Sequence, residues 1–121
     1  ITADPLSPAG GTAVIVGAIG GAIVYFSIVF LEKAGVDDPV GAISAHGTVG
    51  IYGVLVVALT GGASFMGQLT GVVMIAAFTY LASLGTIYVI NMVMPIRASD
   101  AEQEAGLDIS EVGIEAYPEF K

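Results

Sequence analysis

The most constraining feature of this sequence is a stretch of fifty-eight residues, 39–96, without a single aspartate, glutamate, lysine or arginine. A bilayer core about 30 Å thick needs about 20 consecutive apolar residues per helix. Three hydrophobic blocks reach that length, at about 10–31, 40–60 and 69–94. We therefore expect an all-α integral membrane protein, with three transmembrane helices in the region 1–97.

The overall composition points to the same class of protein. Hydrophobic residues make up 55% of the 121 positions and charged residues 12%, with a mean hydropathy of +0.89, far from the averages of soluble domains. Residues 1–8 lack the basic start of a secretory signal and contain two prolines. The absence of cysteine excludes disulfides and thiol chemistry. We expect no enzymatic activity and no cofactor.

The breaks between the blocks contain recognisable turn signals. Residues 32–39 include four charged side chains and end in Asp38-Pro39, a pattern typical of an N-cap followed by proline at the first helical position. We therefore expect the second helix to begin there. The glycine-rich segment 61–64 predicts a short turn before the third helix. At 1.5 Å per residue the third block is about 39 Å long, so it should tilt or project beyond the bilayer.

The distribution of charge predicts the topology. Two membrane crossings separate Lys33 from Arg97 and Lys121, so all three cations should lie on one side, which the positive-inside rule makes cytoplasmic. Residues 98–121 contain seven acidic residues and one lysine, and hold most of the net charge of −8. We expect this segment to be an acidic, cytoplasmic C-terminal tail. Nucleic-acid binding is not expected, because the tail would repel phosphate and the chain has no basic patch.

His46 is the only histidine and lies inside the uncharged stretch. It could hydrogen-bond a neighbouring helix and fix packing. Alternatively, polar groups at bilayer depth usually face the bundle interior or an aqueous path, where they serve ion or proton movement. An imidazole can accept and donate protons near neutral pH, which favours the functional interpretation. A metal site is less favoured, because the chain has no second histidine and no cysteine.

Glycine spacing indicates close packing of helices. Small residues four apart, at Gly17 and Gly21 and at Gly67 and Gly71, let helices approach each other. On a regular helix, His46 would share one face with the residues four, seven and eleven positions further on, Gly50, Gly53 and Val57. Glycine is frequent in membrane helices, so these spacings support packing without identifying a function.

Two segments of the chain carry a family resemblance. Residues 37–53, DDPVGAISAHGTVGIYG, resemble a segment in which DDP is followed by the motif HGxxGxxG. The histidine that begins this motif lies seven residues after the proline. Residues 106–118, GLDISEVGIEAYP, resemble the tail signature GLD-[IL]-[ST]-x-x-G-x-x-AY. Both belong to the ammonium transporters of the Amt/Mep/Rh family. By this resemblance the chain supplies helices nine to eleven and the tail, about the last third of the family's length.

The resemblance implies a fold and a site. Family members have eleven membrane helices, ten of them forming two inverted five-helix repeats around a pore, and assemble as trimers. His46 matches the pore histidine of helix ten, whose partner on helix five belongs to the missing helices one to eight. The histidine pair lets a narrow apolar pore pass ammonia once ammonium is deprotonated. Structural roles are implied for five further residues of this segment: Asp38, Pro39, Gly47, Gly50 and Gly53.

The aromatic residues near this segment receive no substrate role. The aromatic ammonium-recruitment site of the family belongs to earlier helices, so Tyr52 and Phe65 are expected to be packing or interface residues. Tyr52 stands where family members often carry tryptophan.

The tail allows two interpretations. Its charge alone is typical of a disordered, solvent-facing segment. The resemblance instead implies that it packs on the cytoplasmic face, couples the subunits and, in many prokaryotic members, lies near the site where PII-type signalling proteins bind. Four residues would serve this role, with Gly106 and Gly113 in turns, Asp108 as a helix cap and Tyr117 as an anchor.

Two other functions stay open at this point. The chain could be a non-transporting accessory subunit or remnant, favoured if no companion polypeptide carries helices one to eight. It could also belong to an ammonium sensor built on the same fold. Under the transporter interpretation its partners are ammonium or ammonia, the lipid bilayer and the missing helices.

Overall fold

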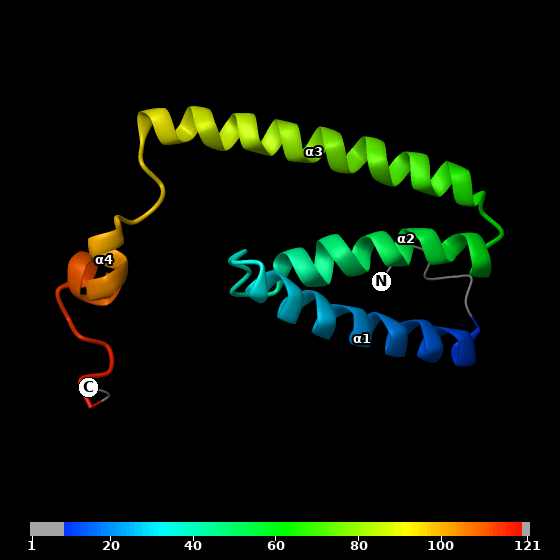
Figure 1. Ribbon diagram of the computed structural model, residues 1–121, viewed down its shortest axis with the longest axis horizontal. Helices are drawn as coiled ribbons and strands as arrows, with labels where there is room; N and C mark the ends of the chain where they lie inside the picture. Colours follow the sequence, from blue (N-terminus) through cyan, green and yellow to red (C-terminus); the bar gives the residue numbers. More distant parts are fainter. Residues whose placement is uncertain (1–8, 120–121) are drawn as a thin grey trace. The chain divides into compact units, whose positions relative to one another are not determined.

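The computed structural model describes residues 9–119, and every regular element in that part of the chain is a helix (Figure 1). The all-α prediction is therefore confirmed. The predictions made for residues 1–8 and for Lys121 lie outside the described residues. In chain order the elements are α1 (Gly10–Lys33), the π-helix η1 (Ile43–Thr48), α2 (Val49–Thr60), α3 (Phe65–Val93), α4 (Asp100–Ala105) and a second π-helix η2 (Asp108–Val112).

Three helical segments within the described residues are long and apolar enough to cross a membrane: Gly10–Lys33, Ile43–Thr60 and Phe65–Val93. The third begins four residues before the expected position 69, because Ser64 acts as its cap. The Ser64 hydroxyl accepts a hydrogen bond from the Gly67 N–H at 3.3 Å, and its carbonyl accepts one from the Gln68 N–H at 2.9 Å. Large apolar side chains are exposed along all three segments, as expected for surfaces that face lipid or further helices.

The described residues form two compact units, 9–78 and 79–119. In the first unit α1 packs against η1 and α2 as a helical hairpin, and Figure 1 shows α1 and α2 side by side. In the second unit α4 contacts η2.

Small residues and a polar bond join the helices of the hairpin. Gly20 of α1 and Gly53 of α2 are buried, which lets the two backbones approach each other. The Tyr52 hydroxyl donates a hydrogen bond to the Val16 carbonyl at 3.2 Å, as expected for a packing residue. By contrast, a Cβ added at Gly17 or Gly21 would meet nothing within 4 Å in the described chain, so these two glycines are not at a close contact.

The second helix begins later than the sequence predicted. Gly41 donates its N–H to the Asp38 carbonyl at 3.0 Å, closing a turn that contains Pro39, and Gly41 itself has a φ of +66°. Proline at the second position of such a turn is as favourable as proline at the start of a helix. Because a left-handed residue cannot belong to a right-handed helix, η1 starts at Ile43. The expectation that Pro39 is the first helical residue was therefore wrong.

Candidate functional site

His46 lies in the π-helical turn η1, between α1 and α2 in the first unit. The Val49 N–H donates to the Ser44 carbonyl five residues earlier, the bond that defines this wide turn. π-Helical turns are rare in proteins and occur frequently at functional sites. The sequence offered no signal for this geometry.

Asp38 fixes the beginning of this turn. One carboxylate oxygen accepts the Ile43 N–H and the other the Ser44 N–H, both at 3.0 Å. Ser44 is completely buried. Its hydroxyl is near the same carboxylate but does not meet hydrogen-bond geometry. Asp38 thus caps the first N–H groups of the segment, as a helix cap does, although it lies five residues before η1.

The ionisation of Asp38 reflects these bonds. Desolvation raises the pKa of its carboxyl, but the backbone N–H groups of Ile43 and Ser44 lower it by more, so the pKa lies below the ordinary value of 3.8. The carboxylate therefore remains ionised at neutral pH, in the form that accepts both bonds.

A hydroxyl pair fixes the other end of the turn. Thr48, the last residue of η1, has its Oγ1 atom 3.0 Å from the Ser27 Oγ atom of α1, within hydrogen-bond distance. Ser27 lies 21 residues earlier in the chain, so this contact joins the turn to a neighbouring helix. No pattern in the sequence predicts a role for either hydroxyl.

His46 itself is exposed in the described chain. It lies in the span Ile43–Thr60, which contains no formally charged side chain. Gly53, expected on the same face, is buried, so the two residues differ in environment. The i→i+5 turn explains the difference, because it changes the register between His46 and the regular helix that follows.

The remaining predicted residues of this segment have varied surroundings. A Cβ at Gly47 would lie 3.8 Å from Ile43 Cγ2, and one at Gly50 would meet nothing within 4 Å. Tyr52 and Phe65 border an apolar groove of about 460 Å³, and Phe65 is 52% exposed.

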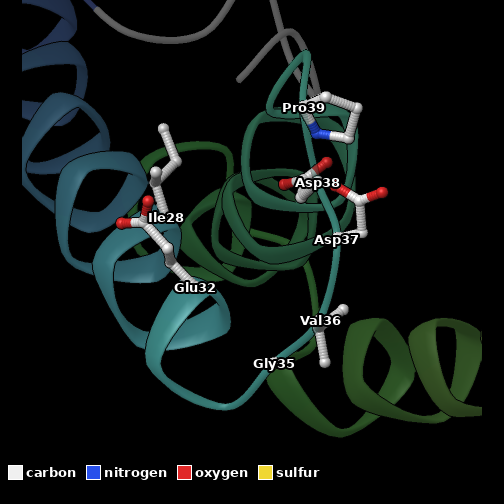
Figure 2. A pocket seen from close by; sticks show the side chains of 7 residues that line it. All are labelled: Ile28, Glu32, Gly35, Val36, Asp37, Asp38 and Pro39. Atoms are coloured by element: carbon white, nitrogen blue, oxygen red, sulfur yellow. The ribbon is translucent and has the colours of Figure 1, made fainter. Parts of the chain in front are cut away.

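A separate hollow of about 420 Å³ lies beside the loop before η1 (Figure 2). Three carboxylates border it, from Glu32 at the end of α1 and from Asp37 and Asp38 in the loop. His46 is not among the lining residues. Within the described part of the chain, no group of three histidine, cysteine or acidic residues could hold a metal ion.

The tail contains ordered local structure. Ser99 and Glu102 form a capping box at the start of α4, in which the Ser99 hydroxyl accepts the Glu102 N–H at 3.3 Å and the Glu102 carboxylate accepts the Ser99 N–H at 2.7 Å. The Ser99 side chain and backbone lower the pKa of Glu102 below its ordinary value of 4.5. The Ser-x-x-Glu spacing is visible in the sequence and could have predicted this cap.

We expect the capping box to be sensitive to acid. Because folding lowers the pKa of Glu102, its contribution to α4 is fully present above pH 4.5 and is lost as the pH falls through the lower, folded value. The chemical shift of the Ser99 amide should follow this transition. Glu102→Gln should remove the transition, whereas Glu104→Gln should leave it unchanged. A Ser99 shift that does not move below pH 4.5 would contradict the assignment.

The four residues predicted for the tail motif lie at or near η2. Gly106 and Gly113 have φ values of +97° and +72°, and a Cβ at Gly106 would lie 2.6 Å from Asp108 Oδ1. Asp108 is the first residue of η2, and its carboxylate accepts the Ala116 N–H at 2.7 Å, which lowers its pKa. This bond connects the first residue of η2 to the segment that follows the helix. The side chain of Tyr117 is 68% exposed.

Comparison with known proteins identifies the family. The model of the Ammonium Transporter Family matches residues 3–117. The chain belongs to the ammonium transporter family. This agrees with the resemblance of the two sequence motifs, and together with the three candidate spans it makes the chain a membrane protein.

Individual relatives support the same assignment. Ammonium transporter Amt2 of Methanocaldococcus jannaschii is 33% identical over 96% of this chain and 29% of its own length. Ammonium transporter Amt1 of Haloferax mediterranei is 35% identical over 88% of this chain and 22% of its length. The ammonium transporter of Bacillus subtilis is 28% identical over 93% of this chain and 33% of its length. The chain thus spans about a third or less of these relatives.

Proposed function

We propose that this chain is the C-terminal part of an ammonium transporter, that it contributes one of two pore histidines, His46, and that its tail is cytoplasmic and regulatory. The observation that carries the proposal is the position of His46 in a π-helical turn, inside an uncharged candidate membrane span of a family member. The remaining helices of the fold would supply the second histidine. We call this chain together with those helices the assembled transporter.

The chemistry of the site supports selective passage of a neutral amine. A bare cation has a large desolvation penalty in an apolar pathway, and neutral ammonia does not. An imidazole can accept the proton that ammonium releases and pass it onward along the pathway, because it changes charge near neutral pH. Ammonia and the proton then cross separately, and the net charge moved is that of ammonium. With no formally charged side chain in residues 39–96, this chain's membrane segments α2 and α3 contribute no fixed counter-ion to the pathway. His46 would then bind the substrate and handle its proton without trapping a cation.

The tail would transmit regulation between subunits of a trimer. Its short helices and the three hydrogen bonds accepted by the carboxylates of Glu102 and Asp108 give it defined local structure. An acidic segment that served only to remain solvated would not need such structure. A PII-type signalling protein is the partner that we propose for the cytoplasmic face. The support for this role is the tail signature, because the family match extends to residue 117.

Gly113 provides a test of the tail. Its φ of +72° suits glycine and is strained for other residues, although a Cβ there would meet nothing within 4 Å. We expect Gly113→Asp to reduce ammonium uptake about tenfold while membrane insertion and assembly remain normal. Gly113→Asn should be milder, because asparagine and aspartate both tolerate the left-handed region but asparagine adds no negative charge to the acidic tail. Wild-type uptake by a correctly assembled Gly113→Asp variant would contradict the regulatory role.

The companion helices can be sought directly. The experiment is mass-spectrometric sequencing of intact polypeptides that copurify with this chain in mild detergent. Polypeptide sequence carrying the remaining helices and a second histidine, on this chain or on a companion, together with an ammonium-evoked current, would support the proposal. Absence of such sequence and of current would instead favour an accessory subunit.

A further inference from the structure

We propose that Ser27 and Thr48 are positioning residues for His46, holding the end of the π-helical turn against α1 so that the imidazole keeps its orientation. This inference rests on the proposed function of His46. Neither hydroxyl is assigned a role by the family resemblance or by the comparisons.

The turn that carries His46 is anchored at both ends. At the start, Ser44 is bound through its N–H to Asp38 and through its carbonyl to Val49. These bonds are local, because the three residues lie in the loop, in η1 and at the first position of α2. They fix the shape of the turn but do not tie it to another helix.

The hydroxyl pair supplies a hydrogen bond to a second helix. Thr48 Oγ1 and Ser27 Oγ are 3.0 Å apart, and Thr48 is only two residues after His46. In a regular helix successive side chains are about 100° apart, so a change in the register of the π-helical turn would rotate His46 by a comparable angle. A hydrogen bond from the last residue of η1 to α1 opposes that rotation.

The apolar surroundings favour the hydrogen bond between Ser27 and Thr48. In the hydrocarbon region no water competes for a hydroxyl, so the two groups satisfy each other. Tyr52, one turn further on, donates to the Val16 carbonyl and ties α2 to the same helix. That bond joins α2 to α1, whereas the Ser27–Thr48 hydrogen bond joins η1, which also packs against α1, to the same helix. Loss of the Ser27–Thr48 bond should therefore change the orientation of the His46 imidazole more than the packing of α1 against α2.

The test compares Ser27→Ala and Thr48→Val in the assembled transporter. The readout is the pH dependence of ammonium uptake, with kcat and KM measured separately. We expect each variant to lower kcat about threefold, and at most about twentyfold, with KM nearly unchanged and the pH profile displaced. The double variant should be no worse than either single one, because both remove the same bond. Ser27→Thr and Thr48→Ser keep a hydroxyl and should restore the wild-type profile.

Thr70→Val is the matched control. The Thr70 hydroxyl donates to the Met66 carbonyl of its own helix at 2.8 Å, so the substitution removes a hydroxyl of the same kind without breaking an interhelix bond. It should leave kcat, KM and the pH profile unchanged. His46→Ala, measured in parallel, tests the pore role of His46 separately from the positioning role of Ser27 and Thr48. If it transports normally, the proposed function fails.

Two results would overturn the positioning role while leaving the proposed function intact. The first is a loss of transport in His46→Ala with wild-type pH profiles in Ser27→Ala and Thr48→Val. The second is a failure of both hydroxyl variants to assemble, because the pair would then belong to the general packing of the hairpin.

Discussion

Replacing His46 by aspartate should leave a measurable current but remove the discrimination between ammonium and other monovalent cations. A carboxylate at this position would place a fixed negative charge in a span that has no other formal charge. Fixed carboxylates favour cations over neutral ammonia. The reversal potential under potassium and ammonium gradients measures this change. In the wild type it should respond to ammonium alone, and in His46→Asp it should respond to both ions.

His46→Asn is the control for size and polarity. Asparagine is close to aspartate in volume but carries no charge, so this variant should lose transport without gaining a potassium current. Unchanged selectivity in His46→Asp, with normal assembly, would count against the proton-handling role.

Removing the carboxylate of Asp38 should disrupt the turn that carries His46. Asp38→Ala leaves the N–H groups of Ile43 and Ser44 without their acceptors, and Ser44 is completely buried. An N–H group that loses its partner in a buried site is strongly unfavourable. We expect ammonium uptake to fall about tenfold or more. Asp38→Asn should be intermediate, because its amide retains one oxygen acceptor.

Asp37→Ala is the matched control for this prediction. It removes the neighbouring carboxylate from the same loop and leaves both bonds from Asp38 intact. Uptake should stay within about twofold of the wild type. Equal effects of Asp37→Ala and Asp38→Ala would show that loop charge, and not the two hydrogen bonds, is what matters.

The fold class could be predicted from the sequence because it depends on the length and hydrophobicity of whole segments and not on individual residues. Three apolar blocks of bilayer length leave few alternatives to transmembrane helices. The start of the second helix could not be predicted in the same way. Pro39 suits both the first turn of a helix and a turn before one, and the choice is made by Gly41, whose positive φ ends the turn.

The candidate site was predictable only in part. His46 is conspicuous because it is the sole histidine in an uncharged stretch. The π-helical turn around it depends on bonds from Asp38, Ser44 and Val49 whose geometry no sequence pattern specifies. Ser27 was missed because a hydroxyl in an apolar block carries no signal until its partner is known. The capping box of α4 was the opposite case, with a pattern present in the sequence.

The measurement that tests the central claim most directly is the ammonium-evoked current of the assembled transporter carrying His46→Ala, recorded beside Thr70→Val. Removing a proton-handling group typically lowers rates by about a hundredfold or more. We predict a loss of that size in His46→Ala and a wild-type current in Thr70→Val, with equal amounts of assembled protein. A wild-type current in His46→Ala would contradict the account and leave His46 as a packing residue.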